Sequence, residues 1–108
     1  MTEATPLQLD THGFLKNPDD WNVAIASQRA QELGLSKLRA KHWELIEEAR
    51  YQFLRYGSVP PPQHLCKARN SAPECVNQLF GGPLSLWMIA GLPDPGEEVR
   101  NYFYNEEC

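Results

Sequence analysis

The sequence of 108 residues contains no apolar stretch close to the ~20 residues that a helix needs to cross a bilayer. Residues 1–10 have neither a basic start nor an apolar run, so they do not resemble a secretion signal. Only three cysteines are present, an odd number and too few for a disulfide scaffold, which is typical of a reducing compartment. These features predict a cytoplasmic protein with no membrane partner.

The sequence also has few signs of a self-contained enzyme. It has no glycine-rich phosphate loop, no paired acid motif and no Ser/His/Asp signature. His64, Cys66 and Cys75 provide a partial set of metal-ligating side chains, but structural zinc usually has four ligands in tighter paired spacing. We therefore expect no metal, no cofactor and no complete active site within this chain alone.

The net charge of −4 is unevenly distributed. Residues 1–28 carry one Lys and four acids, residues 29–69 carry eight Lys or Arg and four acids, and residues 70–108 carry one Arg and six acids. The basic central band can face RNA, DNA or an acidic partner, or it can simply keep helix surfaces soluble. The negative total opposes tight non-specific binding to nucleic acid, because phosphate contacts supply most of that affinity.

The hydrophobic pattern predicts an α+β domain that is mainly a helical array. Residues 7–15 are expected to form a small N-terminal β-hairpin or meander, because Leu7 and Leu9 alternate and residues 10–13 are turn formers. A helix is expected to start at residues 17–20. Further helices are predicted over residues 36–56, 63–69, 74–80 and 83–90, with a stiff connector at 60–62. The predicted buried stripe of the longest helix consists of Trp43, Ile46, Ala49, Phe53 and Leu54.

The last segment has the features of a helix start. Residues 94–97 place a capping acid before a proline at the first helical position and a glutamate at the third. Val99, Tyr102 and Phe103 follow at i, i+3 and i+4 and would form one apolar face. We therefore predict that residues 95–105 are at least partly helical and docked on the rest of the chain.

Five motifs occur along the sequence in a fixed order. They are Asp10-Thr11-His12-Gly13-Phe14-Leu15, Asp20-Trp21, His42-Trp43-Glu44-Leu45-Ile46, Leu65-Cys66-Lys67 and Ile89-Ala90-Gly91-Leu92-Pro93. In this combination the chain resembles the DsrC/TusE sulfur-relay family over about residues 7–95. The resemblance implies a DsrC/TusE-like domain over residues 1–93 and a C-terminal arm of the same domain over residues 94–108.

The resemblance also implies a function. Members of the family carry a near-terminal cysteine that accepts sulfur as a persulfide or trisulfide. TusE-like members pass it toward the thiouridine of tRNA, and DsrC-like members serve dissimilatory sulfite reductase with a second arm cysteine. For this chain the implied reactive residue is Cys108. The protein would be a sulfurtransferase-type carrier acting as a co-substrate between a sulfur-donor relay protein and an acceptor such as a tRNA thiolation enzyme or sulfite reductase.

The chain departs from the family pattern around its cysteines. Cys108 follows a longer insert after the Gly-Leu-Pro motif, and the second arm cysteine would fall near Trp87, so an arm disulfide is not expected. Cys66 replaces an aliphatic residue of the family pattern and is therefore expected to be a small buried side chain.

The surroundings of Cys108 in the sequence are acidic. A sulfur carrier needs an accessible thiolate, but Glu106, Glu107 and a terminal carboxylate would raise the pKa of this thiol. Lys67 and Arg69 are the candidate binding residues that would supply cations if the tail folds back, although an ordinary surface lysine remains an alternative for Lys67.

A second function stays open beside the carrier hypothesis. The missing second arm cysteine, the acidic surroundings of Cys108 and the amphipathic face with Val99 and the candidate binding residues Tyr102 and Phe103 fit a non-transferring adaptor or regulator. Such a protein would bind a sulfur-metabolism complex or, through the basic band, nucleic acid, which is the less favoured partner. Trp43 is interpreted as core, and His42 as a residue that bonds to backbone or contacts a partner without being catalytic.

Overall fold

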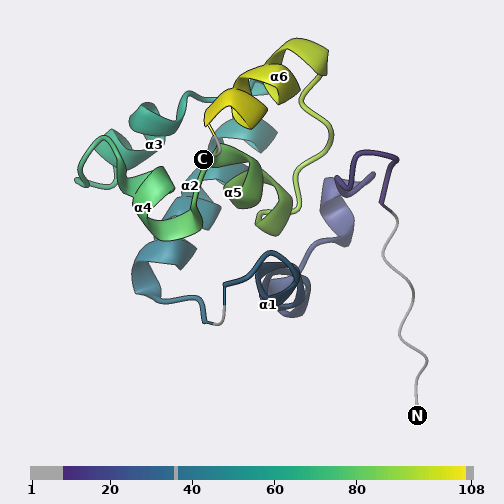
Figure 1. The fold of residues 1–108 in the computed structure, drawn as a ribbon, viewed down its shortest axis with the longest axis horizontal. Coiled ribbons are helices and arrows are strands. Elements are labelled where there is room, and N and C mark those ends of the chain that lie inside the picture. The colour runs from purple at the N-terminus through teal and green to yellow at the C-terminus, as the bar shows by residue number, and fades with distance from the viewer. Residues whose placement is uncertain (1–8, 36, 107–108) are drawn as a thin grey trace.

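A computed structural model describes residues 9–35 and 37–106 of the chain, and in this part the protein is an array of helices. The elements are η1 (Pro18–Asp20), α1 (Val23–Glu32), α2 (Ala40–Tyr56), α3 (Pro62–Ala68), α4 (Cys75–Phe80), α5 (Pro83–Ile89) and α6 (Glu97–Glu106). The short helix α5 is central and packs against α1, α2, α4 and α6 (Figure 1). Within the described residues, no helix combines the length and apolar character needed to cross a membrane.

The predicted β-hairpin is not confirmed. In the described part of this segment a single antiparallel bridge joins Leu9 and Leu15, and Leu7 lies outside the described residues. The Asp10 carboxylate explains the local structure, because it accepts hydrogen bonds from the backbone N–H groups of His12 (2.9 Å) and Phe14 (3.0 Å). The turn is therefore built around one side chain, and its far end is anchored by burial of Phe14 among the helices.

The first α-helix begins later than predicted. Asn17 caps only the 3-10 turn η1, and α1 starts afresh with Asn22 as its cap, whose Oδ1 accepts from the backbone N–H of Ile25 at 2.9 Å. Trp21 separates the two turns, because its indole Nε1–H donates to the carbonyl of Ile89 at 2.8 Å. A long-range bond to the end of α5 thus interrupts what is locally a good helix start.

The long helix α2 also begins later than residue 36, at Ala40. The His42 ring accepts a hydrogen bond from the backbone N–H of Arg39 (3.0 Å) through Nδ1, and its Nε2 lies 2.9 Å from the carbonyl oxygen of Leu79. His42 is buried and bonds to backbone, which confirms one of the two roles expected for it. The predicted buried stripe is wrong at Leu54, which is 51% exposed.

The end of α5 is held by a close contact between Trp21 and Gly91. Gly91 has φ +69°, and a Cβ at this position would lie 2.1 Å from Cδ1 of Trp21. Arg50 covers the other side of this contact, because its guanidinium lies 4.3 Å from the Trp21 ring centroid and donates to the carbonyl of Ala90 at 2.8 Å. Burial lowers the pKa of Arg50 from its ordinary value, and nearby Asp19 opposes this shift.

The predicted C-terminal helix is confirmed as α6, and it is docked. Phe103 is 2% exposed and packs edge-on against Trp87 of α5, with ring centroids 5.9 Å apart. Phe53 of α2 contacts the same indole at 5.6 Å, and the Trp87 Nε1–H donates to the carbonyl of Pro93 at 2.7 Å. Trp87 therefore joins α2, α5 and α6 in one core.

The cysteines differ from the prediction. Cys66 is buried, as expected, but it is not a free apolar side chain: it forms a disulfide with Cys75 that joins α3 to α4. The two residues are nine positions apart and their Cα atoms lie 5.9 Å from one another. The pairing was not predicted because a count of three cysteines gives no information on which of them meet in the fold.

Candidate functional site

The predicted reactive residue, Cys108, lies outside the described residues. Helix α6 ends at Glu106, two positions before it. The observable part of the candidate site is therefore a set of three cavities that share the residue Gln63, two of which are lined by residues of α6. They lie on α3, on the loop between α3 and α4, and on α6 itself.

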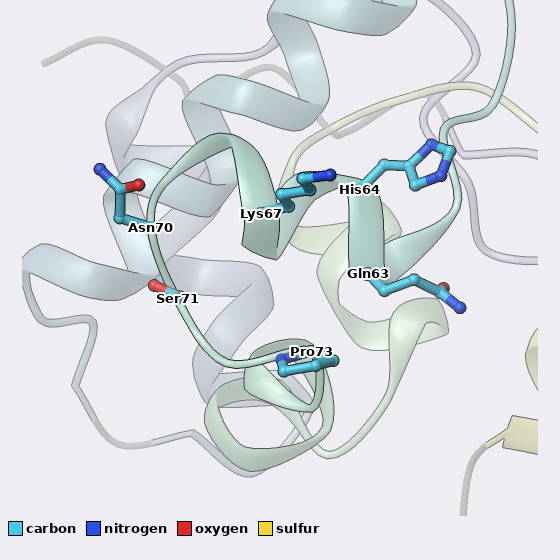
Figure 2. Close-up of a pocket in the computed structure, with 6 residues that line it drawn as sticks. All are labelled: Gln63, His64, Lys67, Asn70, Ser71 and Pro73. Carbon is cyan, nitrogen blue, oxygen red and sulfur yellow. The ribbon is translucent and has the colours of Figure 1, made fainter.

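A cavity of about 380 Å³ lies on the outer face of α3. Its lining residues are Gln63, His64, Lys67, Asn70, Ser71 and Pro73. Figure 2 shows His64 and Lys67 projecting from α3 while Asn70 and Ser71 come from the following loop. Ser71 Oγ is also 3.4 Å from Nζ of Lys41 in α2, so a second cation approaches this loop. The arrangement offers hydrogen-bond donors and positive charge to a small anionic group.

The two predicted cations have different environments. Arg69 donates from Nε to Glu48 of α2 at 2.9 Å, and both side chains are partly buried, so its charge is already paired. Lys67 is exposed and takes part in none of the ion pairs formed among the described residues. Lys67 is thus the predicted cation that remains available to a ligand or partner.

A second cavity of about 400 Å³ lies between the proline connector and α6. Its lining residues are Val59, Pro60, Pro61, Pro62, Gln63, Glu98, Val99, Tyr102 and Phe103. Tyr102 is 44% exposed at this edge, whereas the buried Phe103 forms the inner wall. A third cavity, about 300 Å³, continues from Tyr102 to the start of α4, and Gln63 lines all three. The hollowed surface therefore extends from α6 along α3 to Lys67.

The start of α6 is fixed by charge pairing. The Asp94 carboxylate accepts from the backbone N–H of Gly96 at 2.9 Å and from the Arg100 guanidinium at 2.6 and 2.7 Å. The bond from the Gly96 N–H is the main cause that lowers the pKa of Asp94 from its ordinary value; burial opposes it, and the bond and charge of Arg100 add to the lowering. This pairing holds the segment before α6 against the helix, so α6 is anchored at Asp94 as well as at Phe103.

The residues considered for metal binding are not free to act together. Cys66 and Cys75 are bonded to one another, and His64 lies on the exposed face of α3. Within the described residues no group of three or more potential ligands is brought together. Sequence reasoning missed the disulfide itself; the cysteine count gave no signal for it, and the one local signal was the turn at Arg69-Asn70 between two short helices.

Known proteins are similar to most of this chain. The family model described as "DsrC like protein" matches residues 1–99, which end nine positions before Cys108. The sulfurtransferase TusE of Sodalis glossinidius is 31% identical over 100 residues, covering 84% of this chain and 92% of the relative. The TusE of Escherichia coli is 29% identical over 102 residues, covering 86% of this chain and 93% of its own length.

Solved structures are also similar. The oxidized gamma-subunit of the dissimilatory sulfite reductase (DsrC) from Archaeoglobus fulgidus has a TM-score of 0.72 and 31% identity, covering 84% of this chain and 90% of that chain. The DsrC/gamma subunit of Pyrobaculum aerophilum has a TM-score of 0.72 and 33% identity, covering 84% and 85%. The match over residues 1–99, the identity to curated relatives and the common fold agree: the chain belongs to the family of DsrC-like proteins.

Proposed function

We propose that this protein is a sulfur-relay carrier that accepts sulfur from a donor's cysteine persulfide on Cys108 and passes it to an acceptor. The observation that carries the proposal is a family scaffold over residues 1–99 followed, nine positions later, by Cys108. The relatives named sulfurtransferase TusE support the transfer chemistry. We further propose that residues 94–108 act as the arm of the domain formed by residues 1–93, and that the relay operates in the cytoplasm.

The chemistry requires no oxidant. The thiolate of Cys108 attacks the outer sulfur of the donor persulfide, the donor sulfur–sulfur bond breaks, and the donor leaves as a thiolate. One sulfur atom and one proton move to Cys108, which becomes the persulfide. The acceptor step repeats this exchange in the opposite sense. The protein is thus a co-substrate, because both bonds form and break with a partner's reactive group.

The available cation at Lys67 supports a role in holding the tail or a partner. A segment with Glu106 and Glu107 is opposite in charge to Lys67, which lines the cavity on α3. Contact with a cation stabilises a nearby thiolate and so makes it a better attacking group. We assign Lys67 to this role and Arg69, which is paired with Glu48, to holding α3 in place.

The partner surface in this proposal is the hollowed face between α6 and α3. Tyr102 supplies an exposed aromatic ring, of the kind enriched in protein interfaces, to two of the three cavities of this face, and the buried Phe103 holds α6 in position. The donor would be another sulfur-relay protein. The acceptor would be a tRNA thiolation enzyme or a sulfite reductase, by analogy with the TusE relatives and with the DsrC structures, which are named as subunits of dissimilatory sulfite reductase.

Transfer can be tested by intact mass measurement. The full chain, incubated with a persulfurated donor protein, should gain the mass of one sulfur atom, and the Cys108→Ser variant should gain none. A Cys66→Ser/Cys75→Ser variant is the matched control. It replaces cysteine by serine at the two buried positions and leaves Cys108 in place, so it should still be labelled. Equal labelling of the wild type and Cys108→Ser would refute the carrier function.

A second candidate is a non-transferring adaptor that binds a sulfur-metabolism complex. It is favoured by the end of the family match at residue 99, before Cys108, and by exposed Tyr51, Leu54 and Tyr56 on α2. Affinity capture with wild type and Cys108→Ser distinguishes the two functions. An adaptor retains both its partners and its cellular function without the thiol. A carrier can still bind its partners in the Cys108→Ser variant but loses its cellular function. Any nucleic-acid binding through the basic band should fall steeply with added salt.

A further inference from the structure

The disulfide between Cys66 and Cys75 joins the two ends of a loop whose residues are exposed or partly buried. Cys66 is 0% exposed in α3, and Cys75 is 4% exposed at the first position of α4. The Cys66 carbonyl oxygen accepts hydrogen bonds from the backbone N–H groups of Ser71 (2.8 Å) and Arg69 (3.1 Å). These bonds tie the start of the loop to the backbone of one of the bonded cysteines.

The disulfide closes a ring formed by residues 66–75. This ring provides four of the residues that line the cavity of about 380 Å³ on α3, called here the Lys67 cavity. The lining residues inside the ring are Lys67, Asn70, Ser71 and Pro73. Figure 2 shows the loop with Asn70 and Ser71 running from the end of α3 to Pro73, which lies two residues before α4. Asn70 adopts φ +55°, a conformation that side chains other than glycine rarely occupy. The width of the cavity therefore depends on a loop that is held at both ends by one covalent bond.

Opening the disulfide does not require the helices to separate. Both α3 and α4 pack independently against α2, and Arg69 holds the end of α3 through its ion pair with Glu48. The loop residues between Arg69 and Cys75 are exposed or partly buried, so a local opening of this loop is enough to admit a small thiol. The structure thus combines a buried bond with an exposed connecting loop between the two bonded cysteines.

We propose that Cys66 and Cys75 form a reversible thiol–disulfide couple, separate from Cys108, that sets the rigidity of the Lys67 cavity. The reagents are small thiols and disulfides of the glutathione class. In reduction, a thiolate attacks one sulfur of the pair to give a mixed disulfide, and a second thiol displaces it. Two thiols lose two electrons and become one disulfide, while Cys66 and Cys75 gain two electrons and two protons. Oxidation is the same exchange in reverse.

The functional consequence concerns the loop and its cavity. In the disulfide state the ring fixes Asn70 and Ser71 beside Lys67, and the cavity is preformed for an anionic group. In the dithiol state the loop has more conformational freedom. Binding of an anionic group then includes the entropy cost of ordering the loop, so the group binds less tightly. The cavity would thereby respond to the thiol–disulfide balance around the protein without any change at Cys108.

The test uses the full-length Cys108→Ser chain, which has only the two cysteines of interest. The protein is equilibrated without denaturant in a series of oxidised and reduced glutathione mixtures and quenched in acid. It is then unfolded and alkylated. Mass measurement should show a reversible transition between no adduct and two adducts. Hydrogen exchange should accelerate about tenfold or more at the amides of Arg69 and Ser71 in the dithiol form, while amides of α5 keep their rates.

The matched control is Cys66→Ala/Cys75→Ala in the same background, whose loop amides should exchange at the fast rate in every mixture. The wild-type pair is compared with itself in two states, so the result does not depend on how well this variant folds. If the pair is reduced only after global unfolding, or if the amides of Arg69 and Ser71 exchange equally fast in both states, the proposal is wrong and the disulfide is purely structural.

Discussion

The contact between Gly91 and Trp21 makes a quantitative prediction about the stability of the fold. In Gly91→Ala, the new Cβ would lie 2.1, 2.6 and 2.8 Å from three carbon atoms of Trp21, so the indole has to move. Moving it breaks the 2.8 Å bond from its Nε1–H to the Ile89 carbonyl and its stacking with Arg50. Left-handed backbone strain, overpacking and one lost hydrogen bond together give a destabilisation of roughly 3–5 kcal/mol.

A matched control is available in the same chain. Gly57 has φ +73°, close to the +69° of Gly91, but nothing lies within 4 Å of a Cβ at that position. Gly57→Ala therefore carries the backbone strain without the collision and should cost only about 1–2 kcal/mol. The difference between the two variants measures the collision with Trp21 alone.

The assay is urea unfolding followed by circular dichroism, with the free energy of unfolding extrapolated to water. The Gly91→Ala change should cost much less when it is made in a Trp21→Ala chain, because the colliding atoms are gone. Equal destabilisation by Gly91→Ala and Gly57→Ala, or no coupling with Trp21, would falsify this explanation of how the end of α5 is held.

Three other perturbations have defined outcomes. Phe103→Ala should destabilise the chain by about 3–4 kcal/mol and increase proteolysis of α6, whereas the exposed Tyr102→Ala should cost less than about 1 kcal/mol; equal urea midpoints would contradict the docking of α6. The pKa of Asp94 is lowered in the folded chain, so ionised Asp94 contributes to the free energy of unfolding above about pH 4, and this contribution is lost on further acidification. In acid titration, Asp94→Asn should therefore lose less stability between about pH 5 and pH 2 than the wild type does. Reduction of the disulfide, which spans nine positions, should lower the free energy of unfolding by about 2–3 kcal/mol, measured by urea unfolding with and without reductant; no change in midpoint would mean that the bond does not form.

Local signals were sufficient to predict the C-terminal helix. The proline and glutamate after Asp94 and the spacing of Val99, Tyr102 and Phe103 are all contained within one short segment. The helix spans Glu97–Glu106, so its apolar face and its end agree with the prediction, but it starts two residues later than expected and Pro95 is not its first residue. Asp94 instead accepts from the N–H of Gly96, before the helix begins. Long α2 was predicted for the same reason, apart from its first residues.

Long-range contacts explain what could not be predicted. The break at Trp21 depends on the Ile89 carbonyl, 68 positions away, and no local pattern contains that information. The exposure of Leu54 depends on how much of α2 its neighbours cover. In the candidate site the sequence identified Lys67 and Arg69 as cations, but only the fold distinguishes the exposed Lys67 from Arg69, which is paired with Glu48.

The docking of Phe103 on Trp87 has a consequence for how sulfur could be handed over. With α6 in place, the two positions that follow Glu106 extend the chain by at most about 7 Å. A donor or acceptor would then have to bring its own reactive sulfur to the end of this helix, and the encounter would be a close fit of two protein surfaces. A longer reach would require the Phe103 ring to leave the core. The contact between Phe103 and Trp87 would then limit how far the thiol can move, and breaking it to extend that reach would lower the stability of the fold.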